Sequence, residues 1–431
     1  MHVVEEFANW AVEARSLRFA PEVWHHARRA VIDWHAALYP GAILAPATLL
    51  EKALAEELDR GEARLALGRK ATARAAALIN ATAAHTAELD DIFRDGIYHP
   101  GAPTIAAASA LAGGRNLLRA VVVGYEISTR IGAAMGRAHY KYWHNTGTIG
   151  CFGAAAAAAE ALGLDARRFA HALATVATFS AGLQQAFRMD SMSKPLHAGH
   201  AAEAGVTAAL AAREGVTGSL DVMEGEAGYG RAMGDNPDWR KALATLGRDF
   251  HITRMTFKNH ACCGHTFAAI DGALALKQKL GIRAADIDEV EVATYRAGLE
   301  VAHYENPTTA AEARFSLKYV VATGLTHGSV RLAAFEKQRI EDHATRALMK
   351  RIRVSLDPQL DAAFPSQRAA RVAISAGGRR EELLQPTRIG DPDAPLSDAQ
   401  LAAKYLELAV PVLGERKAKD ELERLWALEG Q

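Results

Sequence analysis

The segment NATAAHTAELDDIFRDGIYHPGAPT, residues 80–104, places acids and imidazoles between two stretches built mainly of Ala, Leu and Ile. Its ionisable residues of interest are His85, Glu88, Asp90, Asp91, Asp95 and His99. An acid moved toward apolar neighbours becomes a weaker acid, while a desolvated His becomes a weaker base, so both can exchange protons near neutral pH. The segment is consistent with a proton-transfer site and, equally, with a solvated loop whose Asp residues cap helices.

Helical periodicity dominates the chain around this segment. From Pro21 to Leu58, apolar residues such as Ala27, Val31 and Trp34 recur at three- and four-residue spacing. Further helical stretches, rich in Ala and Gly, are expected at residues 71–89, 116–138, 151–162, 166–186 and 198–213. Because small side chains let helix axes approach closely, residues 1–253 are predicted to form a large all-helical domain.

The pattern changes beyond residue 250. Alternating polar and apolar residues at 288–294 and 351–355 predict strands. Residues 371–375 are predicted to form the first strand of a hairpin, which turns at Ala-Gly-Gly and continues as a second strand at 381–384. Helices are expected between them at 268–280, 315–327 and 342–349. Residues 254–393 are therefore predicted to form a smaller α+β domain. A capping box, Ser397 to Gln400, starts a last helical region within residues 394–431.

The amino-acid composition limits the classes of protein to which this chain can belong. The chain has 431 residues, 49% of them hydrophobic, with 50 basic and 50 acidic residues. Since no basic stripe interleaved with aromatic residues appears, nucleic acid is not expected as a partner. No basic segment followed by an apolar one marks the start, and no strongly apolar run of about 18 residues follows, so we expect a cytoplasmic protein without membrane contact.

The three cysteines, Cys151, Cys262 and Cys263, include an adjacent pair and offer neither a disulfide framework nor paired zinc-ligand spacing. An iron–sulfur cluster is normally held by several separated thiolates. We therefore expect reduced thiols, no metal and no cofactor.

Two later segments repeat the association of His, Lys and Tyr with Gly and small residues: HYKYWHNTGTIG (139–150) and MDSMSKPLHAGHAA (189–202). Together with GYEISTRIG (124–132), FKNHACCGHTFAAID (257–271) and EARFSLKYVVATGL (312–325), they make the sequence resemble the MmgE/PrpD family, in order and over most of the chain. The resemblance implies a large helical domain, an α+β lid domain and C-terminal helices that return to the first domain.

His99 precedes Pro100, which restricts it to extended backbone, so this His belongs to a fixed loop. The resemblance matches His99 to an active-site histidine and Asp90 and Asp91 to the acidic pair before it. Relatives often read Asp-x-Asp-Asp where this chain has Glu88-Leu89-Asp90-Asp91. Which of these acids faces the substrate is left open.

His144 stands just before an Ala-rich helix, whose N-terminal amides could hold a carboxylate. The structural alternative is a core His bonded to a backbone carbonyl. Lys194 lies in apolar sequence close to His197 and His200, where partial desolvation would suit a proton carrier or a carboxylate anchor. Most lysines are instead simply solvated.

The resemblance implies three further site residues in the second half of the chain. Lys258 would contact substrate, and Tyr319 would reach the site from the lid. Cys263 stands where decarboxylase members carry a His and dehydratase-like members a Cys. Ordinary burial is the alternative for both Cys263 and Tyr319.

These residues favour elimination of water from a small hydroxy-polycarboxylate, such as 2-methylcitrate or a citrate-like acid, by a metal-independent hydro-lyase. His99 and an acid of residues 88–91 would handle protons, His144 would assist, and Lys194 and Lys258 would bind carboxylates. The first alternative is proton abstraction and return alpha to a carboxylate, as in iminodisuccinate epimerase. Cis-aconitate decarboxylation ranks third, because of Cys263 and because Ile92 replaces a usual Thr. A non-enzymatic metal-binding or scaffold protein using its 17 His residues is the remaining alternative.

The resemblance also predicts a homodimer, since family relatives are dimers and Ala-rich helices present flat faces suited to a two-fold interface. Light scattering at low protein concentration is expected to give twice the chain mass of 46.2 kDa. A monomer at every concentration would contradict this.

Overall fold

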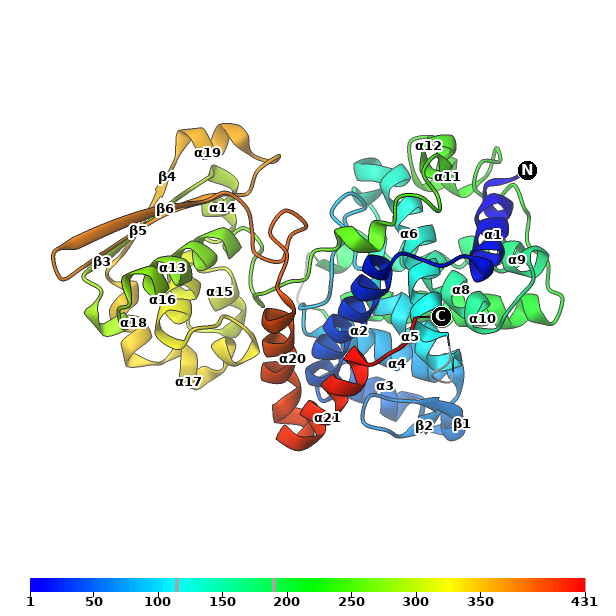
Figure 1. Ribbon diagram of the computed structural model, residues 1–431, viewed down its shortest axis with the longest axis horizontal. Helices are drawn as coiled ribbons and strands as arrows, with labels where there is room; N and C mark the ends of the chain where they lie inside the picture. Colours follow the sequence, from blue (N-terminus) through cyan, green and yellow to red (C-terminus); the bar gives the residue numbers. More distant parts are fainter. Residues whose placement is uncertain (113–115, 188–190, 431) are drawn as a thin grey trace. The chain divides into compact units, whose positions relative to one another are not determined.

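The structure is a computed structural model and describes residues 1–112, 116–187 and 191–430 (Figure 1). The chain divides into two compact units. Unit 1 comprises Met1–Phe257 and Ser397–Gln431, and unit 2 comprises Lys258–Leu396. Both ends of the chain thus belong to unit 1, and unit 2 is inserted between them.

Unit 1 is mainly helical. Its α-helices are α1 (Val3–Glu13), α2 (Pro21–Ala42), α3 (Ala47–Ala53), α4 (Ala73–Thr86), α5 (Gly101–Leu111), α6 (Leu117–Tyr140), α7 (Asn145–Thr148), α8 (Gly150–Ala161), α9 (Ala166–Ala177), α10 (Ser193–Arg213), α11 (Tyr229–Met233), α12 (Trp239–Leu243), α20 (Asp398–Leu413) and α21 (Glu415–Trp426).

The Ala-rich helix α8 forms the centre of unit 1, and α5, α6, α9 and α10 pack around it. The six consecutive alanines at residues 154–159 are all fully buried, as expected of a helix that is apolar on every side. Neighbouring helices meet α8 through glycine: a Cβ at Gly124 would lie 2.6 Å from the carbonyl oxygen of Gly153, and one at Gly205 2.5 Å from the Cβ of Ala154. The small residues therefore set how closely these helices approach.

Unit 1 also contains a two-stranded antiparallel sheet, so the prediction of an all-helical domain was wrong in this detail. Strand β1 (Leu58–Arg64) pairs with β2 (Lys70–Ala71). The chain reverses at Gly68, whose φ of +94° favours glycine. The hairpin is held because Leu58 and Ala63 of β1 and Ala71 of β2 pack with Ile79 of α4 in one apolar cluster.

Several helix boundaries also differ from the predicted ones. Helix α9 ends at Ala177 rather than continuing to residue 186. The chain then passes through Gly182, whose φ of +131° is incompatible with a helix. Helix α5, which the sequence did not predict, begins directly after Pro100. Helix α10 starts at Ser193, five residues before its predicted start at 198, because Pro195 is tolerated in a first helical turn.

Unit 2 carries a four-stranded mixed sheet in the order β4-β3-β5-β6. Its strands are β3 (Glu289–Thr294), β4 (Ile352–Leu356), β5 (Ala370–Ala376) and β6 (Arg379–Gln385). Its helices are α13 (Phe267–Leu280), α14 (Arg296–Val301), α15 (Ala310–Arg314), α16 (Leu317–His327), α17 (Lys337–Ile340), α18 (His343–Met349) and α19 (Pro358–Ala363).

The sheet register explains the alternating pattern seen in the sequence. Strands β3 and β4 are parallel, whereas β3–β5 and β5–β6 are antiparallel. Gly377 and Gly378, both at positive φ, turn β5 into β6 and confirm the predicted hairpin. Helix α13 packs against β5 and β6 (Figure 1). Unit 2 is therefore a small α+β unit with one helix-covered sheet face.

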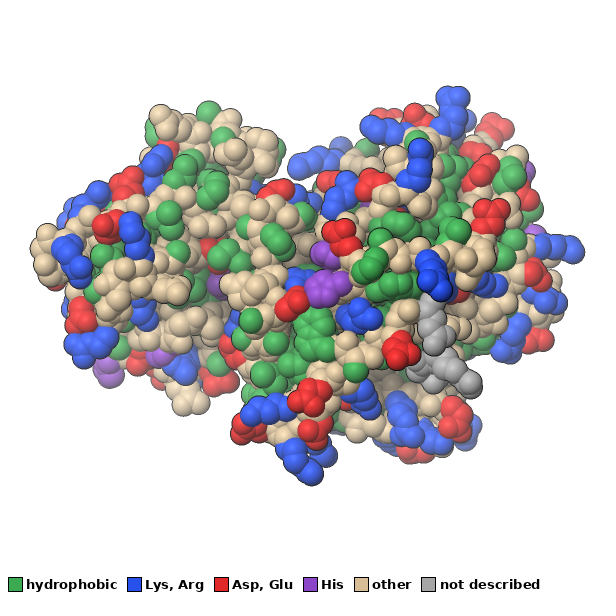
Figure 2. Space-filling view, in the orientation of Figure 1, with side chains coloured by type: hydrophobic (Ala, Val, Ile, Leu, Met, Phe, Trp, Pro, Cys, Tyr) green, Lys and Arg blue, Asp and Glu red, His purple; other side chains and the backbone are tan. Residues whose placement is uncertain are grey.

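Charged side chains of both signs are interspersed over the visible face of each unit (Figure 2). Within the part of the chain that the structure describes, none of the helices combines the length and the apolar character needed to cross a membrane.

Helix α20, the first helix after unit 2, is joined to α2 by a buried ion pair. Lys404, which is fully buried, donates through Nζ to Asp33 Oδ1 at 2.6 Å and to the carbonyl oxygen of Leu89 at 2.8 Å. Burial raises the pKa of Asp33 to about 6, although Lys404 opposes this. One ammonium group thus ties together three segments that are far apart in the sequence.

Replacing Lys404 by Met is expected to lower the free energy of unfolding by about 3–5 kcal/mol, because it leaves the Asp33 carboxylate and the Leu89 carbonyl buried without their cation. Urea unfolding followed by circular dichroism measures the change. Lys419→Met is the matched control, since Lys419 forms an exposed i,i+4 pair with Glu415 and should change stability by about 0.5 kcal/mol or less. Equal effects of the two substitutions would contradict the role given to Lys404.

Candidate active site

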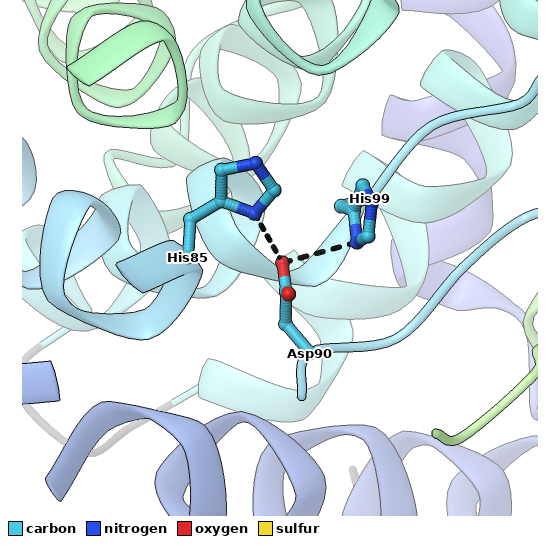
Figure 3. Close-up of side chains that lie close together, drawn as sticks. All are labelled: His85, Asp90 and His99. Atoms are coloured by element: carbon cyan, nitrogen blue, oxygen red, sulfur yellow. Dashed lines mark hydrogen bonds and ion pairs between the residues drawn. The ribbon is translucent and has the colours of Figure 1, made fainter. Parts of the chain in front are cut away.

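Asp90 is the centre of a cluster of ionisable side chains in unit 1 (Figure 3). It lies in the loop between α4 and α5, with 1% of its surface exposed. The Nδ1 atom of His85 is 2.8 Å from Asp90 Oδ2, and Nδ1 of His99 is 3.2 Å from the same oxygen. Two imidazoles from opposite ends of the loop therefore converge on one carboxylate oxygen.

The loop that carries this cluster is fixed at several points. Helix α4 ends at Thr86, which leaves His85 in its last turn. Phe93 and Tyr98 exchange backbone hydrogen bonds across a short turn, and Pro100 follows His99 as α5 begins. The backbone N–H of His99 donates to Thr146 Oγ1 at 3.2 Å. His99 is thus held in a loop, as its Pro neighbour predicted.

A second pair of imidazoles adjoins the first. His144 precedes α7, and its backbone N–H donates to the Gly182 carbonyl at 2.9 Å. Its Nδ1 lies 3.0 Å from Nδ1 of His197, which projects from the first turns of α10. The ring of His144 also stacks on that of His85, with centroids 5.5 Å apart. His144 is buried, and one nitrogen of its ring contacts another imidazole.

Gly182 makes this second pair possible. Its φ of +131° turns the chain between α9 and α10, and a Cβ here would lie 3.2 Å from the His197 ring. A side chain at this position would therefore press against the imidazole pair.

Protonation differs between the two pairs. Although burial opposes ionisation of Asp90, the imidazoles of His99 and His85 lower its pKa well below the usual value. Burial lowers the pKa of His144, and that of His197 to about 4, with His85 and Lys194 adding to both shifts. At neutral pH Asp90 is consequently an anion, while His144 and His197 are neutral and can share one N–H between them.

Lys194 and Glu88 form an ion pair beside the imidazoles. Lys194 lies in the first turn of α10, and Glu88 follows α4. Their side chains are 24% and 34% exposed, whereas those of His85 and Asp90 are at most 1% exposed. The His99 side chain is 13% exposed. Among these residues, His99, Lys194 and Glu88 are therefore the ones whose side chains solvent reaches.

Asp91 faces a different environment from Asp90. Its Oδ1 accepts from the backbone N–H of Gly101 at 2.9 Å, and its Oδ2 from the Tyr125 hydroxyl at 2.8 Å. Burial, reinforced by the charge of Asp33, raises its pKa to about 8. Of the acids whose orientation the sequence left open, Asp90 contacts the imidazoles and Asp91 holds the start of α5.

Three predicted site residues belong to unit 2. Lys258 is its first residue and is partly buried. Cys263 is buried, which raises the pKa of its thiol, and its backbone N–H donates to the Arg314 carbonyl at 3.0 Å. Tyr319 is fully buried in α16, where its hydroxyl donates to the Ala334 carbonyl. Within unit 2 this is the arrangement of a packed tyrosine.

The His85, Asp90 and His99 side chains are also of the types that bind zinc. One ligand atom from each lies within 4.8 Å of the other two. Three such ligands with a fourth position open are typical of catalytic zinc sites. The geometry therefore permits a divalent metal as well as the hydrogen-bonded arrangement.

Sequence reasoning did not assign His85 to the site, although it contacts Asp90 and His144. Its place five residues before Asp90, at the end of an Ala-rich helix, was the available signal. The supporting roles of Tyr125 and Lys404 had no such signal, because their partners are distant in the sequence.

The pKa of Asp91 gives a prediction for stability. Because its folded pKa is raised to about 8 from 3.8, the folded state holds a proton that the unfolded state loses. Unfolding free energy should therefore fall as pH rises from about 4 to 8, by up to about 1.4 kcal/mol per pH unit, and level off above that. Asn keeps an acceptor for Gly101 and does not titrate, so the difference between parent and Asp91→Asn should follow this course in urea unfolding. A difference that is constant with pH would show that Asp91 titrates normally.

Comparisons with known proteins agree with this architecture. Residues 5–242 match the MmgE/PrpD N-terminal domain, and residues 260–428 match the MmgE/PrpD C-terminal domain. A cis-aconitate decarboxylase-like protein, oryM, of Aspergillus oryzae (strain ATCC 42149 / RIB 40) is 25% identical to this chain over an alignment that covers 96% of this chain and 92% of that protein. Human cis-aconitate decarboxylase is 28% identical over 66% of this chain and 61% of its own length. The chain therefore belongs to the MmgE/PrpD family.

Proposed function

We propose that the protein is a hydro-lyase that eliminates water from a small hydroxy-polycarboxylate, of the 2-methylcitrate or citrate type, by acid–base catalysis without a metal. The observation that carries the proposal is the Asp90–His99 pair, in which a buried anion orients an imidazole that is itself accessible. The His144–His197 pair and Lys194 beside it supply the other groups that such a reaction needs.

His99 is proposed to remove the proton from the carbon next to a substrate carboxylate. In the tautomer that places the proton on Nδ1, 3.2 Å from Asp90 Oδ2, the Nε2 atom of His99 carries the lone pair that accepts this proton. The ionised Asp90 then stabilises the imidazolium that forms. His85 donates to the same Asp90 oxygen and fixes its position.

His144 and His197 are proposed to return a proton to the leaving hydroxyl. Both are neutral in the free protein, in part because Lys194 adds positive charge nearby. A bound polycarboxylate would offset that charge and raise their pKa, which favours the imidazolium needed to donate. The carbon–oxygen bond then breaks, and the hydroxyl departs as water while the double bond forms.

Lys194 and Lys258 are proposed to bind substrate carboxylates, as the sequence suggested. For Cys263 and Tyr319 the family resemblance supports places near the substrate, while burial of both favours support of unit 2. Asp91 is proposed to position the start of α5 rather than to transfer protons, because its partners are Gly101 and Tyr125.

Decarboxylation of cis-aconitate is the second candidate, since the relatives that match this chain carry that name at 25–28% identity. Incubation with citrate, 2-methylcitrate and cis-aconitate separates the two reactions. Double-bond absorbance without release of carbon dioxide supports the hydro-lyase, and carbon dioxide from cis-aconitate supports the decarboxylase. Deuterium uptake from solvent without a new double bond would instead support an epimerase.

A metal-dependent or purely metal-binding role would use His85, Asp90 and His99. Metal analysis of the purified protein tests it together with activity after chelation. Stoichiometric zinc or iron whose removal abolishes turnover would overturn the metal-free proposal.

Replacing His99 by Asn is expected to lower kcat by about 100- to 10,000-fold, the usual contribution of a general acid–base group. Asn retains some hydrogen-bonding capacity but cannot transfer the proton, so circular dichroism should show an intact fold. Steady-state kinetics on the identified substrate gives the measurement. His2→Asn is the control, because His2 is exposed before α1 and should leave kcat unchanged. Near-parent activity of a folded His99→Asn protein would refute the role of His99.

A further inference from the structure

The ion pair between Lys194 and Glu88 bears directly on ligand binding. Lys194 lies three residues before His197, and its charge lowers the pKa of both His144 and His197. Its ammonium group is nevertheless already bound by the carboxylate of Glu88. Any carboxylate ligand of Lys194 therefore meets a carboxylate of the protein itself.

The position of Lys194 on α10 makes it a suitable anchor. Lys194 and His197 are three residues apart in the first turns of this helix and so lie on one face. His197 in turn contacts His144 at 3.0 Å. A carboxylate held by Lys194 would thus lie next to the imidazoles proposed to donate the proton.

Glu88 is held in place by its backbone. Its φ of +58° lies in the left-handed region, which is unfavourable for a residue with a side chain other than Asn or Asp. The next residue, Leu89, is fixed through its carbonyl by the buried Lys404. A backbone conformation this unfavourable persists only where the surrounding structure enforces it, and such conformations are concentrated at functional sites.

We propose that the Glu88 carboxylate occupies, on Lys194, the place of a substrate carboxylate, so that a polycarboxylate ligand binds by displacing Glu88. This inference deepens the proposed function and rests on its substrate class. Glu88 then weakens binding of every carboxylate ligand at this position. Glu88 also selects among ligands, because its carboxylate is already attached to the protein beside Lys194. Only a ligand whose other carboxylates bind elsewhere in the site can displace it.

The inference predicts the opposite of an ordinary substrate-binding role for Glu88. Removing a contact normally weakens binding, whereas removing an internal competitor strengthens it. Glu88→Gln keeps the size of the side chain, and Glu88→Asn suits the left-handed backbone; both lose the charge. Their affinity for a tricarboxylate should rise by about three- to tenfold, the range expected for a partly exposed ion pair together with relief of like-charge repulsion.

The experiment measures binding of propane-1,2,3-tricarboxylate, a citrate analogue without the hydroxyl, by titration calorimetry of the full chain. Because it has no leaving group for dehydration, the measurement is independent of turnover. The matched control is Glu203→Gln, which removes the same charge from an ion pair on α10 with Arg74, well along the helix from Lys194. Lys194→Gln completes the set and should weaken binding in the presence or absence of Glu88.

Tighter binding by both Glu88 variants, with Glu203→Gln unchanged, supports the proposal. Parent-like or weaker binding by the Glu88 variants overturns it, while tricarboxylate binding by the parent that depends on Lys194 leaves the proposed function standing. Equal tightening by Glu203→Gln also overturns it, since the effect would then be one of net charge. If no variant binds the tricarboxylate, both this inference and the proposed substrate class fail.

Discussion

An ionised carboxylate buried among helices is the constraint on which the candidate site depends. Asp90 has 1% of its surface exposed, and burial by itself would keep it protonated. It stays charged only because His85 and His99 direct Nδ1 at the same oxygen. The end of α4, the His99–Pro100 turn and the contact of His99 with Thr146 all serve to hold those two imidazoles in reach of it.

The Ala and Gly content of unit 1 supplies the rigidity that such an arrangement needs. Around α8, missing Cβ atoms at Gly124 and Gly205 bring helix backbones into direct contact. Interiors packed this closely leave little room for side chains to shift. The loops that connect these helices are therefore held in fixed positions. This support benefits acid–base groups, whose productive geometry must be kept to within a few tenths of an ångström.

Sequence patterns predicted the parts of the molecule that depend on local periodicity or on a single strong neighbour. The strands β3 to β6, the Gly377-Gly378 turn, helices α13, α16 and α18, and the loop position of His99 follow from such signals. The hairpin β1–β2 was missed because its second strand is only two residues long. The end of α9 was missed because the glycine that excludes a helix stands five residues beyond it.

The candidate site was predictable in its residue types but not in its pairings. Asp90 and Asp91 are adjacent and chemically identical, and only tertiary contacts give one to the imidazoles and the other to Tyr125. Likewise, no local pattern predicts the hydrogen bond of Lys404 to the Leu89 carbonyl or the ion pair between Glu88 and Lys194. These assignments depend on long-range packing, which a single sequence does not contain.

The tie between Lys404 and the Leu89 carbonyl also has a consequence for the order of folding. The two residues are 315 positions apart, and all of unit 2 lies between them. At about 5–20 residues per second, a ribosome needs on the order of 15–60 s to cover this distance. Throughout that time the Asp33 carboxyl and the Leu89 carbonyl of the nascent unit 1 lack their cation, so the loop between α4 and α5 gains its last support only after unit 2 has been made. Limited proteolysis of stalled nascent chains should find this loop protected only once α20 has left the exit tunnel.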